Sequence, residues 1–143
     1  MNAAQLAFLT QLAFLIPPTE DYPATIRQLK EGIPFDSVEE LQRVLGVSNQ
    51  SIAELAGISS RTLARRKVEK RLTQEEGEKV LRLMRVTQRA LELFEGDLDA
   101  ARRWLNAPDS ALEGRTPLQY ADTYPGYEFT MRYIGRLEHG IPT

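Results

Sequence analysis

Apolar residues in this chain recur every three or four positions, which is the spacing of one face of an α-helix. The longest such stretch begins at Thr73 and Glu76, a pair typical of a helix N-terminus, and ends at Gly96. It carries two neighbouring apolar stripes, Val80, Met84, Thr87, Leu91 and Phe94 beside Leu83, Val86, Ala90 and Leu93. Two adjacent stripes cover a wide face, so we predict a long helix that joins two parts of the fold.

Capping residues and helix breakers divide the rest of the chain into shorter helices. The expected helices cover residues 24–31, 37–46, 48–57, 97–106 and 126–138, with two more that open at Ser59 or Ser60 and at Thr116. Ser37 and Glu40 form a second capping pair in this interpretation. Alternating β-branched runs and Asn-Gly turns are missing from the sequence, so the predicted fold class is all-α.

The first sixteen residues are apolar, with side chains at helical spacing: Leu6, Leu9, Leu12 and Ile16. No basic residue precedes Arg27, and polar residues interrupt the run, so a signal peptide or a membrane span is disfavoured. We expect an amphipathic N-terminal helix and no membrane association. This helix either packs on the core of its own chain or forms a dimer surface.

The net charge of −2 conceals a strong asymmetry along the chain. Residues 1–60 hold three basic and seven acidic side chains, residues 61–91 hold ten and four, and residues 92–143 hold five and nine. A basic centre between two acidic ends predicts two kinds of partner, of which one is a polyanion.

Residues 48–67 have the pattern of a helix-turn-helix. Ala53 is a small residue where two steeply crossing helices approach, and Gly57 supplies the left-handed conformation that the turn favours. Apolar residues that can form the small core between the helices are Ile52, Leu55, Ile58 and Leu63. A plain helical hairpin has the same spacing. The basic charge concentrated on the second helix favours DNA binding instead.

The second helix would fit the major groove of DNA, where Arg reads guanine and Lys or Arg neutralises phosphate. The predicted DNA-binding residues are Ser59, Ser60, Arg61, Thr62, Arg65, Arg66, Lys67, Lys70 and Arg71. Among them, Arg61, Thr62, Arg65 and Arg66 are expected to reach bases, and Lys67, Lys70 and Arg71 mainly phosphates. One small motif makes few contacts, so we expect a dimer or a larger assembly on DNA.

Residues for catalysis or for holding a cofactor are not apparent in the sequence. The chain has no cysteine, which suits a reducing cytoplasm, and its single histidine is His139. A lone histidine offers no metal site and no Ser-His-Asp arrangement, and no glycine-rich phosphate loop is present. We therefore expect no enzyme activity, no metal and no cofactor.

Aromatic side chains crowd the last third of the chain: Trp104, Tyr120, Tyr124, Tyr127, Phe129 and Tyr133. Such a group forms either a domain core or a binding surface, in which a tryptophan is a frequent hot spot. The residue types alone leave both alternatives open.

The order of several short motifs resembles antitoxins of the Xre/MbcA/ParS type from about Val38 to the end of the chain. These motifs are GIS at 57–59, RTLARR at 61–66, LT at 72–73, RA at 89–90, Phe94, AA at 100–101, WL at 104–105, Pro108, AL at 111–112, RTPL at 115–118 and GRLEHG at 135–140. The resemblance implies an Xre-like helix-turn-helix joined by the long helix to a small helical toxin-binding domain. Residues 1–34 would be an N-terminal extension, 35–88 the DNA-binding domain and 89–143 the toxin-binding domain.

The resemblance also implies the partners of the chain. Such antitoxins bind RES-domain toxins, which deplete NAD, and repress their own operon. This chain would act in the cytoplasm, on the nucleoid when bound to its operator. The expected toxin-binding residues are Trp104, Tyr127, Arg132, Tyr133, Arg136, Glu138 and His139.

The final helix and tail, residues 131–143, would obstruct the toxin's active site, because arginines and a histidine can occupy a site built for phosphates. In the alternative interpretation, this helix has a purely structural role and completes the domain core with Ile134 and Leu137 inside. A different class of function also stays open, a stand-alone dimeric transcription regulator whose C-terminal domain serves dimerisation.

Overall fold

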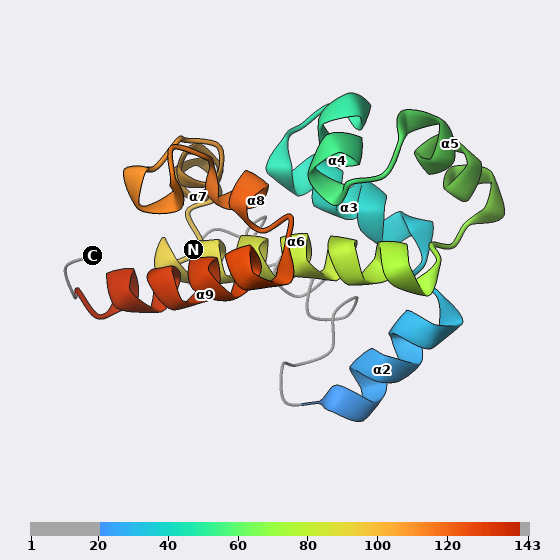
Figure 1. Ribbon diagram of the computed structural model, residues 1–143, viewed down its shortest axis with the longest axis horizontal. Helices are drawn as coiled ribbons and strands as arrows, with labels where there is room; N and C mark the ends of the chain where they lie inside the picture. The colour runs from blue at the N-terminus through green and yellow to red at the C-terminus, as the bar shows by residue number, and fades with distance from the viewer. Residues whose placement is uncertain (1–20, 141–143) are drawn as a thin grey trace. The chain divides into compact units, whose positions relative to one another are not determined.

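The structure is a computed structural model that describes residues 21–140 (Figure 1). Its elements in chain order are α2 (Tyr22–Glu31), α3 (Phe35–Leu45), α4 (Asn49–Ala56), α5 (Ser60–Glu69), α6 (Gln74–Leu93), α7 (Leu98–Leu105), the 3-10 turn η1 (Ser110–Leu112), α8 (Pro117–Tyr120) and α9 (Tyr124–Glu138). Within residues 21–140 no strand occurs, only two isolated β-bridges. The predicted all-α class is confirmed. The apolar N-terminal segment with Leu6, Leu9, Leu12 and Ile16 lies outside the described residues.

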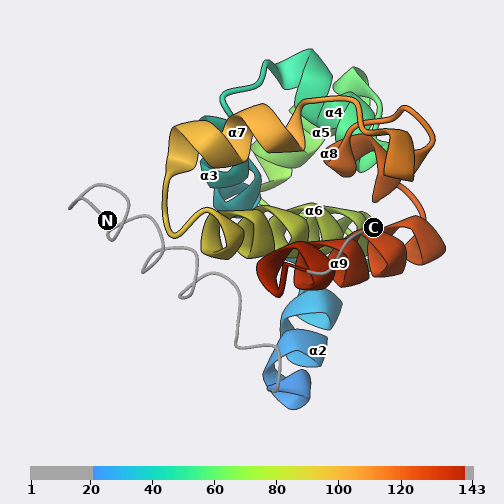
Figure 2. The same cartoon turned by 90° about the vertical axis from the view of Figure 1, so that its left-hand side faces the viewer.

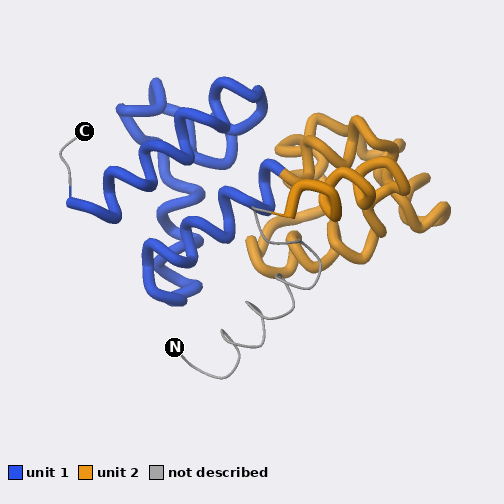
Figure 3. The backbone as a smooth tube through the Cα atoms, turned by 90° about the horizontal axis from the view of Figure 1, so that it is seen from below, with its two compact units in different colours: residues 1–9, 82–143 blue, residues 10–81 orange. Residues whose placement is uncertain are grey.

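The chain divides into two compact units, one within residues 10–81 and one within residues 82–143 (Figure 3). The division falls inside α6, so the first part of this helix belongs to one unit and its second part to the other.

In the unit of residues 10–81, α3, α4 and α5 lie on one side of the first part of α6, and α2 lies on the other (Figure 1). Ser48 and Ser59 cap α4 and α5 by accepting backbone hydrogen bonds from Ser51 and Thr62. Gly57 ends α4 in the left-handed conformation with φ of 65°. The caps and the turn of the helix-turn-helix are therefore confirmed. Its core is built from fully buried apolar side chains, Val38, Leu41 and Ile52 among them.

Prolines shift the starts of three helices from their predicted places. Helix α3 begins at Phe35 behind Pro34, without a side-chain cap, so the predicted capping pair of Ser37 and Glu40 is wrong. Helices α2 and α9 each begin two residues before the prediction and hold Pro23 and Pro125 in their first turn. The first turn of a helix tolerates proline because its N–H groups have no partner inside the helix.

Both predicted stripes are buried along α6 as far as Leu91, whereas Leu93 and Phe94 at their ends are half-buried. Val80, Val86 and Ala90 have no exposed area, and Met84 is 1% exposed. Thr87 is also fully buried, and its hydroxyl donates to the Leu83 carbonyl at 2.7 Å. The predicted capping pair at the start is confirmed, because Thr73 and Glu76 each accept the other's backbone N–H. Apolar contact on a wide face fits the place of α6 in both units.

In the unit of residues 82–143, α9 runs alongside the second part of α6, and α7 and α8 lie on one side of this pair (Figure 2). Leu105, Leu112, Leu118 and Ile134 fill the core and are at most 1% exposed. Gly126 makes the close packing of α8 and α9 possible. A Cβ atom there would lie 1.9 Å from the Tyr120 carbonyl oxygen, so no larger residue fits.

Candidate DNA-binding and partner-binding surfaces

Helix α5 presents most of its side chains to solvent, and Leu63 is its one buried residue. Arg61 and Arg65 are exposed one turn apart on the same face, because helical residues four positions apart are neighbours. The side chain of Arg65 is 59% exposed and lies 3.7 Å from a Glu69 oxygen, at the long end of an ion pair. These two guanidinium groups are therefore open to a ligand.

Arg66 is placed differently from its two basic neighbours. Its Nε donates to Oε1 of Glu76 at 2.7 Å, and a terminal nitrogen donates to Glu69 at 3.0 Å. Its side chain is only 14% exposed. These bonds tie the middle of α5 to the first turn of α6, so the structure sets Arg66 apart from the exposed arginines with which it was grouped.

Glu76 holds this connection at its other end. The same oxygen that accepts from Arg66 also accepts the Thr73 backbone N–H at 2.9 Å. Burial raises the pKa of the Glu76 carboxyl, but the hydrogen bonds from Arg66 and Thr73 lower it more, so its pKa lies below the ordinary value. The ionised carboxylate is thus both the cap of α6 and the anchor of α5.

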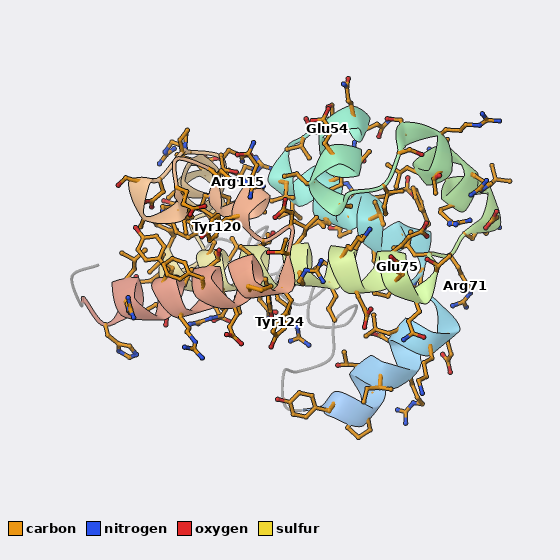
Figure 4. The ribbon with its side chains drawn as sticks, in the orientation of Figure 1. Glu54, Arg71, Glu75, Arg115, Tyr120 and Tyr124 are labelled. Atoms are coloured by element: carbon orange, nitrogen blue, oxygen red, sulfur yellow. The ribbon has the colours of Figure 1, made fainter. Side chains whose placement is uncertain are left out.

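The segment that follows α5 is fastened to the segment before α3. The Phe35 N–H donates to the Lys70 carbonyl at 2.9 Å, and the Leu72 N–H donates to the Ile33 carbonyl at 3.0 Å. Arg71 lies where α5 leads into α6 (Figure 4), and its guanidinium donates to the Gly32 carbonyl at 2.8 Å. Arg71 therefore makes a hydrogen bond that supports the fold, in addition to carrying a positive charge. Lys67 and Lys70 are exposed.

Two predicted residues at the start of α5, Ser59 and Thr62, are hydrogen-bonded to each other. The Ser59 hydroxyl accepts the Thr62 N–H at 3.1 Å and donates to the Thr62 hydroxyl at 2.9 Å. Ser60 is exposed at the first position of α5.

Val68 belongs to the same surface, although sequence reasoning missed it. It is 81% exposed and lies three positions after Arg65 and seven after Arg61, on one helical face with both. In the sequence, only its helical spacing from Arg61 and Arg65 could have indicated that it shares their face. An apolar side chain there could contact a thymine methyl group in the major groove.

In the other unit, the aromatic residues divide between interior and surface. Trp104 lies between Phe94 and Tyr133, with ring centroids 6.4 Å and 6.3 Å away. Tyr133 is buried, and its hydroxyl donates to Asp109 at 2.8 Å. Tyr133 thus lies in the domain interior, and Trp104 lies half-buried beside it.

Tyr127 and Glu138 link α9 with its surroundings. Burial raises the pKa of the Tyr127 hydroxyl, and the positive charge of Arg85 opposes this shift. Glu138 forms an ion pair with Arg89 of α6 at 2.6 Å, which fastens the end of α9. Both side chains therefore have a role within their own unit.

The remaining predicted toxin-binding residues, Arg132, Arg136 and His139, are exposed on α9 and its C-cap. The Arg132 side chain is 74% exposed and 3.8 Å from Glu128. Tyr124 and Phe129, outside the predicted set, are 63% and 41% exposed. Helix α9 consequently offers both aromatic and charged groups to a partner.

Near the start of α9, Arg115 connects α8 to its loop. Its guanidinium lies 5.9 Å from the centre of the Tyr120 ring and donates to Asp122 at 2.8 Å (Figure 4). Tyr120 in turn meets Phe129 edge to face, with centroids 5.9 Å apart. These contacts hold the Arg115 side chain in a fixed position.

Among residues 21–140 no group of three histidine, cysteine or carboxylate side chains is placed to hold a metal ion. In the same part of the chain, no helix combines the length and apolar character needed to cross a membrane.

A helix-turn-helix with an exposed basic second helix, joined through α6 to a separate helical unit, defines a DNA-binding regulator with a second binding domain. Residues 24–85 match the model of the antitoxin Xre-like helix-turn-helix domain. Residues 89–140 match that of the antitoxin Xre/MbcA/ParS C-terminal toxin-binding domain.

Similar proteins of known name agree with both matches. The chain is 35% identical over 125 residues to the Antitoxin Xre of Photorhabdus laumondii subsp. laumondii, covering 87% of this chain and 84% of that protein. It is 33% identical over 117 residues to the Antitoxin Xre of Yersinia enterocolitica serotype O:8, covering 81% and 79%. The chain belongs to the Xre family of antitoxins, which confirms the resemblance found in its motifs.

Proposed function

We propose that this chain neutralises a RES-domain toxin by covering its active site and represses its own operon through α5. One observation carries the proposal: the exposed arginines of α5 and a toxin-binding domain occur in the same chain. In the cytoplasm, such a protein controls both the activity of the toxin and the synthesis of the pair.

On the DNA side, we assign base reading to Arg61 and Arg65, whose guanidinium groups are exposed on one face. Ser60, Lys67 and Lys70 would contact phosphates. Arg66 and Arg71 are positioning residues in this proposal, because both are already bonded to the framework around α5. Ser59 and Thr62 set the start of the helix.

We take residues 35–88 and 89–143 as the two functional domains. Helix α2 is added to the first, because the matched helix-turn-helix region begins at residue 24. A dimer, or a larger complex with toxin, would place two copies of α5 on half-sites about one DNA turn apart.

On the toxin side, the exposed groups of α9 would make the contacts, with Arg132, Arg136 and His139 on one face. Tyr127, which is half-buried, would add the edge of its ring. Trp104, Tyr133 and Glu138 support α9 from within. The cationic groups near the C-terminus would enter a site shaped for the phosphates of NAD.

A short deletion tests the covering of the active site. Because Glu138 is ion-paired to Arg89, the deletion should start at His139 and remove residues 139–143. We expect unchanged folding and DNA binding but loss of protection when a RES-domain toxin from the same operon is co-expressed. The matched control is Glu138→Gln, which breaks the ion pair but keeps the tail. Full protection by the deleted chain would show that inhibition comes from the body of the domain.

A further inference from the structure

Helix α9 contains two glycines, and the fold explains only one of them. Gly126 is required because a Cβ atom would collide with the Tyr120 carbonyl. At Gly135, in the middle of the last two turns, a Cβ atom would meet no described atom within 4 Å. Its backbone is helical, and its carbonyl accepts the His139 N–H at 3.3 Å.

Glycine at such a position lowers the stability of the helix. It gains nothing from its conformational freedom there, and alanine is the more favourable residue in a helix interior. Gly77, the third helical glycine of residues 21–140, differs, because its Cβ would press on Ile33 at 3.3 Å. The described part of the chain therefore gives no internal reason for Gly135.

Gly135 lies at the centre of the outward face of α9. Residues that share this face at helical spacing are Tyr124, Glu128, Met131, Arg132 and His139. The buried residues of α9 are Gly126, Thr130, Tyr133 and Ile134, on the opposite side. Tyr124 is 63% exposed and projects from the start of the helix (Figure 4).

We propose that this outward face is the toxin-docking surface and that a backbone segment of the toxin crosses α9 at Gly135. The missing side chain allows main-chain atoms of a partner to approach the helix closely. The toxin is the occupant because the region that matches the toxin-binding domain, residues 89–140, contains all of α9. The proposal rests on the proposed antitoxin function.

Gly135→Ala tests the proposal because its two effects have opposite signs. In the chain alone, alanine should raise the unfolding temperature by roughly 2–6 °C. In the pair, the added methyl group should weaken binding of a RES-domain protein from the same operon about tenfold or more, since it fills the space for the partner's backbone. Gly135→Leu should abolish binding. A purely structural role would change stability and binding in the same direction.

Gly114→Ala is the matched control. It adds the same methyl group to open space in the same unit, but at φ of 79° and away from α9. It should lower the unfolding temperature and leave toxin binding unchanged.

If the wild-type chain binds the toxin, any of three results would overturn the proposal. The first is an unfolding temperature of Gly135→Ala below that of wild type, and the second is toxin binding by Gly135→Leu as tight as that of wild type. The third is a loss of toxin binding in Gly114→Ala as large as that in Gly135→Ala. A change in the mass of the free chain on Gly135→Leu, measured by light scattering, would assign the face to a second copy instead. If the wild-type chain itself fails to bind the toxin, that result contradicts the proposed antitoxin function and not the role of Gly135.

Discussion

Helices α5 and α9, to which we assign the two binding tasks, are held in place by different forces. Helix α5 buries one side chain and is positioned by a serine cap and by the Arg66–Glu76 ion pair. Helix α9 buries four residues and is surrounded by aromatic rings. A helix such as α5 can thus keep nearly all its surface free when polar bonds at its edges fix its position, which suits the proposed contact with DNA. Removal of polar groups should therefore affect α5, and changes in packing should affect α9.

The largest effect is expected from Gly126→Ala. The new Cβ would need the space of the Tyr120 carbonyl, so α9 must move away from α8. We expect a loss of about 3 kcal/mol or more in the free energy of unfolding, measured by denaturant titration. Gly135→Ala, on the same helix, should have the opposite effect and raise the stability of the chain. A Gly126→Ala chain as stable as wild type would contradict the packing of α8 against α9.

Arg65→Ala separates DNA contact from stability. Because the guanidinium is mostly exposed, its loss should cost about 1–3 kcal/mol in operator binding and relax base preference at one position. The unfolding temperature should hardly change. Arg66→Ala is the control, and it should lower the unfolding temperature together with DNA affinity. Fluorescence anisotropy and thermal unfolding give the two readouts. If Arg65→Ala binds its operator like wild type, α5 does not read bases through this face.

The sequence predicted the helices well where the signal was local. Ser59, Gly57 and the pair of Thr73 and Glu76 act on their immediate neighbours, and the structure confirms all of them. The Ser37 capping pair failed because Pro34 starts α3 earlier, which leaves Ser37 buried with no hydrogen-bond partner for its hydroxyl among the described residues.

The roles within the basic run could not be separated by sequence. Arg65 and Arg66 are adjacent in the chain, and only the fold brings Glu76 to the second of them. The same holds for Tyr133, whose hydroxyl meets Asp109 from 24 positions away. Sequence identifies residue types and local spacing, whereas these partners depend on how distant segments pack.

Glu76→Gln tests the polar side of the comparison. Glutamine can still cap α6, so the change removes mainly the charge that anchors Arg66. We expect a loss of about 1 kcal/mol at neutral pH. Because the folded carboxyl has a pKa below its ordinary value of 4.5, its stabilisation is present above that pH and is lost as the pH falls through the folded pKa.

The stability difference between wild type and Glu76→Gln should therefore shrink at acidic pH, as measured by urea titrations across pH 3–7. Glu75→Gln is the matched control, because Glu75 is exposed in the same turn (Figure 4). Equal effects of the two variants at neutral pH would argue against the anchor.

Lys67→Ala should have the smallest effect. An exposed lysine beside the DNA neutralises phosphate without reading sequence, so its loss should weaken binding to all sequences. The slope of log affinity against log salt concentration should fall by about one. Lys30→Ala, on the exposed end of α2, provides the comparison. An unchanged salt slope for Lys67→Ala would place this side chain away from the DNA backbone.

Growth with a co-expressed toxin is the sharpest test of an antitoxin whose two binding tasks lie on separate helices. The chain and the RES-domain toxin would be expressed from two inducible promoters that lack the operator, so that protection does not depend on repression. We predict that wild type and the double variant Arg61→Ala, Arg65→Ala restore growth equally, whereas Gly135→Leu does not. Failure of wild type to restore growth, or loss of protection in the arginine double variant, would contradict an antitoxin whose two binding tasks lie on α5 and α9.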